Sequence, residues 1–146
     1  SVAGAVAEFI GRRLLEHCED VIIENGGDIF ISTHNDLTVG VFAGASPFSG
    51  KIGLSLKPRG NAVAVCTSSG RVGPSLSFGV ADAVTVVSDT AALADAVATA
   101  AGNMVKMADD IQTALDFAVS VEGVRGVLVI LGSQLGVRGD LELVKL

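Results

Sequence analysis

The 146-residue sequence predicts one α+β domain in which helices pack on a mixed or antiparallel sheet. Short runs of β-branched residues follow one another with only Gly, Asn, Asp or Pro between them, which is typical of strands joined by turns. Helical patterns occur at the start and late in the chain, and they do not alternate with the strands. A regular wound sheet is therefore not expected.

The first half of the chain predicts one helix followed by strands. A helix is expected at 2–17, because Phe9, Ile10 and Leu14 recur at helical spacing with charged residues between them. Strand candidates follow, each bounded by turn residues, at 20–24, 28–33, 37–43, 51–57, 61–67 and 82–88.

The last part of the chain predicts two helices and a pair of strands. The helices are expected at 89–101 and 108–121, and the runs 126–132 and 141–146 are expected to pair around a turn at 136–140. The expected caps are Ser88 or Asp89 and Gly102-Asn103 for the first helix, and Asp109 for the second.

Composition and charge exclude several classes of partner. The net charge is −6 and the pI is about 4.7, so neither nucleic acid nor an anionic membrane is expected to bind. An acidic protein can still bind a phosphate through a divalent cation or backbone amides. Aspartates interrupt the longest apolar stretch, at 80–101, so no membrane span is expected. Cys18 and Cys66 form no metal or redox motif, which favours a reducing cytoplasm.

The start of the chain and its hydropathy suggest contacts beyond the domain. The sequence has no initiator Met and enters a helical pattern at once, so we expect it to lack the N-terminal portion of a longer protein. Hydrophobic residues make up 49% of the chain, and the mean hydropathy is +0.58. We therefore expect a homo-oligomer, and contact between the domain and the missing N-terminal segment.

Asp95 and Thr99 are the first candidate site. A spacing of four on a helix places the carboxylate and the hydroxyl on one face, among alanines and valines that leave it uncluttered. Oxygen ligands of this kind suit a hard cation. The alternative is an ordinary polar pair on a solvent face.

Gly26, Gly27 and Asp28 are the second candidate site. The glycines can adopt positive φ and let a phosphate approach the backbone, and Asp28 could then ligate a metal or accept from a ligand hydroxyl. The alternative is a turn between strands whose aspartate caps its own backbone.

A polar loop that begins at Cys66 is the third candidate. Thr67, Ser68 and Ser69 offer hydroxyls, Gly70 can expose amides, and Arg71 could meet a phosphate through two hydrogen bonds. The loop is neither a Walker motif nor a dinucleotide fingerprint, and a flexible loop also explains it. Apolar neighbours favour a buried strand position for Cys66 over a nucleophile or sulfur carrier.

In order along the chain, these features resemble the ApbE superfamily of flavin transferases, which attach FMN to protein threonines. The matching motifs are the Gly-Gly-Asp turn at 26–28 and the Asp-Ala-x-x-Thr run at 95–99. The chain is still more similar to the branch known as UPF0280 or DUF375. That similarity lies in "ENGGDIFI", "VGVFAGASPFSGKIGLSL", "CTSSGRVGPSLSFGVADAVTVVSDTAALADA" and "GDLELV".

The resemblance implies a single ApbE-like domain over 1–146 that binds Mg²⁺ and a small phosphate-bearing ligand, FAD or FMN. In the superfamily, the late helix holds a magnesium ion that engages the FAD diphosphate. By this resemblance Asp95 and Thr99 are the side-chain ligands, a backbone carbonyl at or before 1–5 completes the set, and Asp28 lines the same cleft. An enzyme of this type would be a Mg-dependent relative of the flavin or nucleotidyl transferases.

One departure from the superfamily favours an alternative function. Flavin transferases carry a His-Ile-Ile-Asp-Pro stretch where this chain has "SLSFGVADA", at 75–83. The missing histidine favours a non-catalytic binding or assembly protein that retains the fold. Some family members are associated with the assimilation of sulfide into homocysteine, which is a further alternative.

Overall fold

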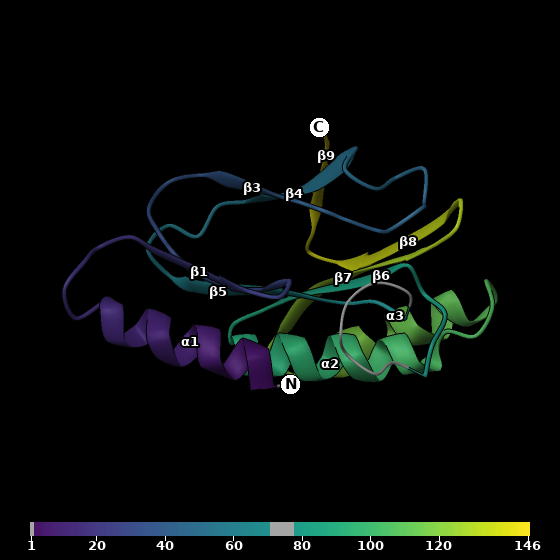
Figure 1. The fold of residues 1–146 in the computed structure, drawn as a ribbon, viewed down its shortest axis with the longest axis horizontal. Helices are drawn as coiled ribbons and strands as arrows, with labels where there is room; N and C mark the ends of the chain where they lie inside the picture. Colours follow the sequence, from purple (N-terminus) through teal and green to yellow (C-terminus); the bar gives the residue numbers. More distant parts are fainter. Residues whose placement is uncertain (1, 71–77) are drawn as a thin grey trace.

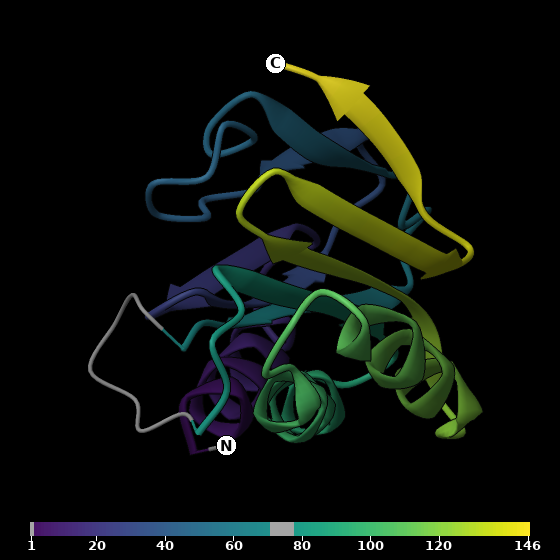
Figure 2. The same ribbon diagram turned by 90° about the vertical axis from the view of Figure 1, so that its right-hand side faces the viewer.

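The computed structural model describes residues 2–70 and 78–146, which form three layers. A layer of helices covers one face of a six-stranded sheet, and a three-stranded sheet covers the other face (Figures 1 and 2). Every strand pairing in the described residues is antiparallel. The predicted α+β class is confirmed, and the sheets are antiparallel rather than mixed.

The described elements follow the predicted order as far as residue 131. The helices are α1 (Val2–Leu14), α2 (Ala91–Met104) and α3 (Asp110–Ser120). The large sheet contains β1 (Val21–Asn25), β2 (Asp28–Ser32), β5 (Ala62–Ser68), β6 (Ala83–Ser88), β7 (Val124–Leu131) and β8 (Gln134–Gly139), in the order β1-β2-β5-β6-β7-β8. The small sheet contains β3 (Leu37–Gly40), β4 (Ile52–Leu56) and β9 (Glu142–Lys145), in the order β3-β4-β9.

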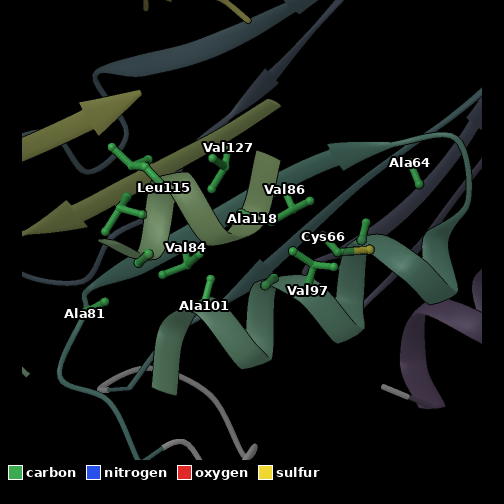
Figure 3. Packing of buried hydrophobic residues seen from close by; sticks show 14 of the residues in the cluster. Ala64, Cys66, Ala81, Val84, Val86, Val97, Ala101, Leu115, Ala118 and Val127 are labelled. Carbon is green, nitrogen blue, oxygen red and sulfur yellow. The ribbon is translucent and has the colours of Figure 1, made fainter. Parts of the chain in front are cut away.

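Small side chains let the helices approach the large sheet closely. In α2 the buried face is mostly alanine, and it packs on Cys66, Val84 and Val86 of the strands (Figure 3). In α1 the buried residues are Gly4, Ala7 and Gly11. A Cβ at Gly11 would lie 2.2 Å from the ring of Phe30, so only glycine fits at that contact.

The second core fills the space between the two sheets. It is built from the opposite set of strand positions, which strand alternation directs away from the helices. Its fully buried side chains include Ile31, Leu54, Leu128 and Ile130. The large sheet is therefore covered on both faces, which explains the long apolar runs of its central strands.

The end of the chain differs from the prediction. The run 136–140, predicted as a turn, belongs mostly to β8, which pairs with β7, while β9 leaves to pair with β4 in the other sheet. Gly136 explains the error, because a Cβ there would lie 2.7 Å from Ile111 and 2.8 Å from Leu115 of α3. Gly136 lets α3 pack closely on β8, whereas the sequence pattern had predicted a turn at this glycine.

The helix caps also differ from the prediction. Thr90, rather than Ser88 or Asp89, caps α2 by accepting from the amide of Leu93, and the helix continues past the predicted glycine end to Met104. Asp109 makes no capping hydrogen bond at α3; instead the Asp110 carboxylate accepts from the amides of Lys106 and Met107. Among the described residues, no helix has both the length and the apolarity needed to cross a membrane.

Candidate functional site

The hairpin between β1 and β2 carries the predicted Gly-Gly-Asp motif. Gly26 has φ 64° and Gly27 has φ 95°, the backbone of a two-residue type I′ turn, which requires positive φ at both positions. The amide of Gly27 donates to Oε1 of Glu24 at 2.8 Å, so this carboxylate fixes the turn. Asp28 is the first residue of β2 and takes no part in this turn contact.

Asp28 faces the helices, where it meets Asp95. The register pairs Asp28 with Cys66, so both side chains point to the face that α1 and α2 cover. The Cys66 thiol and the Asp95 carboxylate both lie close enough to the Asp28 carboxyl to shift its pKa. Asp28 is 7% exposed and Asp95 is 8% exposed, so two carboxyl groups from distant parts of the chain share one buried site.

The helix α1 closes this site from one side. The amide of Gly4 donates to Oδ2 of Asp95 at 3.1 Å, and the side-chain amide of Asn25 donates to the carbonyl of Ala3 at 3.2 Å. A Cβ at Gly4 would lie 2.5 Å from the carbonyl oxygen of Ala91 and 2.9 Å from Cβ of Asp95. Glycine is therefore needed for the backbone of α1 to reach the carboxylate.

The buried environment raises the pKa of Asp28 and of Cys66. Burial and, after it, the negative charge of Asp95 together raise the pKa of Asp28 to about 7, while the neighbouring Cys66 thiol opposes the rise. Burial and the Asp28 carboxylate also raise the pKa of the Cys66 thiol. The Asp28 carboxyl therefore binds a proton more tightly than an exposed carboxyl does.

The donor set of the site fits a hard cation. Asp95 lies on the buried face of α2, and Thr99 follows one turn later in a half-buried position. Two carboxylates and a hydroxyl are all oxygen donors, and Mg²⁺ is usually held by one or two carboxylates while water and phosphate complete its shell. Within 2–70 and 78–146, no group of three or more His, Cys, Asp and Glu residues is placed to bind a metal. A cation would therefore depend on Thr99, backbone oxygen or a ligand for its remaining contacts.

A pocket of about 320 Å³ lies on the opposite face of the same strands, between the two sheets. Four predicted site residues line it: Gly26, Gly27, Thr67 and Ser69. The hydroxyl of Thr67 lies 2.9 Å from that of Thr85, and the amide of Thr67 donates to the carbonyl of Gly27 at 3.1 Å. The first contact joins the end of β5 to β6, and the second joins it to the hairpin turn.

The predicted site residues thus divide between two faces of one sheet. The glycine turn, Thr67 and Ser69 border the pocket, whereas Asp28, Asp95 and the Cys66 side chain lie under the helices. Ser68 ends β5 and lies beside Gly102 of α2. Gly70 packs against the backbone of Gly79, where a Cβ would clash. Arg71 lies outside the described residues.

Sequence reasoning missed several residues of the site. The pocket is also lined by Glu24, Ile29, Val39, Gly40, Phe42 and Val65. Glu8 was missed too: its Oε2 accepts from the amides of Ala91 and Ala92 at 2.8 and 3.4 Å, which joins α1 to the start of α2. An acid in an otherwise apolar helical run is the one local signal that could have indicated this contact.

Cys66 occupies the buried strand position that the sequence predicted. Its side chain is fully buried, and its thiol donates to the carbonyl of Ala91 at 3.4 Å. A buried thiol with a raised pKa holds little thiolate, which is the reactive form. This geometry does not favour Cys66 as a nucleophile or sulfur carrier.

Comparison with known proteins identifies the family of this chain. A family model described as "AbpE bacteria" matches residues 1–143. The UPF0280 protein of Methanococcus aeolicus is 43% identical over 146 residues, and the UPF0280 protein of Methanocaldococcus jannaschii is 42% identical over 151 residues. The chain belongs to the UPF0280 family.

Membership of the UPF0280 family confirms the resemblance seen in the sequence. The match covers 97% of this chain and 59% of the M. aeolicus protein, and 99% of this chain and 61% of the M. jannaschii protein. The UPF0280 protein of Methanosarcina acetivorans is 40% identical, and the chain spans 56% of its length. The chain thus spans about three fifths of these relatives. The name UPF0280 states no ligand or reaction, so function must be argued from the site.

Proposed function

We propose that this domain binds Mg²⁺ together with a phosphate-bearing nucleotide, FAD or FMN, at the end of the large sheet where the β1–β2 turn meets α2. The observation that carries the proposal is the buried Asp28–Asp95 pair, in which two carboxyl groups lie close enough for the charge of Asp95 to raise the pKa of Asp28. A buried pair of like charges is costly at neutral pH unless a proton or metal neutralises it.

The turn beside the pair leaves room for a phosphate. Gly26 has no atom within 4 Å of the Cβ position, so the space above the turn is open to a ligand. Asp95 and Thr99 would hold the cation, and Asp28 would lie beside them. Mg²⁺ bound there would neutralise charge on phosphate oxygens, which is the chemistry expected of a phosphoryl or nucleotidyl transferase.

The proposal is tested by calorimetric titration of FAD into the protein, with excess MgCl₂ or with EDTA. We expect binding to be about tenfold tighter with magnesium, and Asp95→Asn should remove that gain. Asp36→Asn is the matched control, because it removes the same charge from an exposed position. Equal affinity in MgCl₂ and EDTA would overturn the proposal.

A second candidate function is a binding or assembly protein without catalysis. The sequence "SLSFGVADA", which has no histidine, favours this candidate. The same titration mixtures distinguish the two functions when they are analysed for AMP and FMN. Release of these products supports a transferase relative, whereas retained magnesium-dependent binding without release supports the second candidate. A role in sulfide assimilation stays a further alternative.

The proposal also includes self-association of the protein and a cytoplasmic location. The outer face of α1 exposes Val2, Val6, Phe9 and Ile10, by 41 to 77%, and this supports a homo-oligomer or contact with a further segment of the full-length protein. Light scattering on the chain and on a longer form would distinguish these contacts. Both cysteines are free thiols, which supports a reducing cytoplasm.

A further inference from the structure

A second pocket, of about 190 Å³, is lined by residues of both sheets, which face each other in Figure 1. It contains Val63 at the start of β5, whereas the Gly26-Gly27 turn lies beside the end of that strand. The two sites therefore lie at opposite ends of the large sheet. The volume is below the roughly 300–1,000 Å³ typical of pockets for drug-sized ligands, so a smaller molecule is expected.

The inner wall of this second pocket is apolar, and its mouth is charged. Leu56, Val63 and Val87 line the pocket and are only 2 to 8% exposed. The charged residues that line it are all exposed: Lys57, Arg125, Asp140 and Glu142. Two positive and two negative side chains around an apolar wall match a ligand that carries one charge of each sign and an apolar group.

Lys57 and Glu142 form an ion pair at the mouth that a ligand can replace. Nζ of Lys57 lies 3.4 Å from Oε2 of Glu142, and the two side chains are 48% and 59% exposed. An exposed pair of this kind contributes little to stability, so little is lost when its members separate. A ligand carboxylate can then accept from Lys57, and a ligand ammonium group can donate to Glu142.

Arg125 provides a second cation, which is held more firmly. Its Nε and Nη2 lie 2.7 and 2.6 Å from Oδ1 of Asp89, and Nη2 also donates to the carbonyl of Ala62 at 3.4 Å. None of these contacts uses Nη1, which can donate to a ligand carboxylate. The amide of Asp140 donates to the carbonyl of Arg125 at 2.8 Å, so an acidic residue is fixed beside the basic one.

A strained turn holds the wall between β4 and β5. Pro58 lines the pocket, and its carbonyl accepts from the amide of Asn61 at 3.0 Å. Arg59 in this turn has φ 54°, and within 2–70 and 78–146 it is the one non-glycine residue with positive φ. Such backbone strain costs free energy and is most often found at functional sites. The turn fixes the backbone of Pro58, and of Lys57 before it, at the pocket.

We propose that this second pocket binds a free α-amino acid with an aliphatic side chain. The carboxylate of the ligand accepts from Lys57 and Arg125. Its ammonium group donates to Asp140 or Glu142, and its side chain packs on the apolar wall. The inference does not depend on the proposed function, because the buried carboxyl pair takes no part in this site.

The test is calorimetric titration of the protein, in EDTA, with L-valine, L-leucine and L-isoleucine. The compound that binds best is then compared with L-alanine, which lacks most of the apolar group, and with its own N-acetyl and amide forms. The N-acetyl form lacks the ammonium charge, and the amide form lacks the carboxylate. We expect each of these to bind about tenfold more weakly, because each loses one of the three contacts. The inference is overturned if none of the three amino acids binds, or if either blocked form or L-alanine binds equally well.

Two variants assign the charges of the ligand. Lys57→Met should weaken binding of the amino acid about five- to tenfold and leave binding of its amide form unchanged. Glu142→Gln should weaken the amino acid similarly and leave the N-acetyl form unchanged. Lys51→Met and Glu19→Gln are the matched controls, since both residues are exposed and neither lines the pocket. Equal affinity in the pocket variants and the controls would contradict the assignment and overturn the inference.

A second readout gives the position of the ligand. The methyl NMR signals of Leu56, Val63 and Val87 should shift when the amino acid binds. Those of Ile29 and Val39, which line the other pocket, should not. The opposite pattern of shifts would place the amino acid elsewhere and would overturn the inference even if binding is observed.

Discussion

Replacement of Asp28 by asparagine tests the electrostatics of the buried pair. In the folded protein the Asp28 pKa is raised from 3.8 to about 7. A carboxyl with a raised pKa binds its proton more tightly in the folded state, so its contribution to stability is full below the unfolded pKa and disappears as the pH rises through 7. Asparagine resembles the protonated acid at every pH, so Asp28→Asn should remove this dependence.

The magnitude follows from the size of the pKa rise. At about 1.4 kcal/mol for each pKa unit, a rise of about three units gives an upper bound of about 4 kcal/mol. Solvent screening and relaxation around the pair reduce this value. We therefore expect Asp28→Asn to be about 1–3 kcal/mol more stable than the natural chain at pH 8, and to differ much less at pH 5.

Urea unfolding at pH 5 and pH 8 in EDTA measures this difference. Subtracting the variant from the natural chain cancels the pH dependence that the two proteins share. Asp36→Asn serves as the control for loss of one exposed negative charge. The reasoning is refuted if the natural chain and Asp28→Asn show the same change in unfolding free energy between the two pH values.

Three further predictions concern the surroundings of the site. Gly4→Ala should lower the free energy of unfolding by about 1–3 kcal/mol in urea melts, because its Cβ would lie 2.5 Å from the carbonyl of Ala91; unchanged stability would show that α1 packs differently. Asp82→Ala should cost about 1–3 kcal/mol, since Oδ2 of Asp82 accepts from the amide of Gly132 at 2.6 Å in a buried position; a neutral effect would contradict this contact. In native protein an alkylating reagent should modify exposed Cys18 and spare Cys66 until urea is added, as mass spectrometry would show; rapid native labelling of Cys66 would contradict its burial.

Local patterns were sufficient for much of the fold. The Gly26-Gly27 pair between two β-branched runs predicts a hairpin, because a type I′ turn needs two residues at positive φ. The spacing of Asp95 and Thr99 predicts a shared helix face, because neighbours along a helix are fixed by its period. Each of these features depends on residues a few positions apart, so the sequence by itself determined them.

The arrangement of the site required the tertiary structure. The sequence could not determine that Asp28 turns toward the helices while Gly27 faces the pocket, because the face of a strand residue depends on register with a distant strand. It also assigned a turn to Gly136, which lies in β8, and gave no role to Phe42. These features arise where segments far apart in the chain pack together, and the side chains that meet there are chosen by the three-dimensional fold and not by their sequence neighbours.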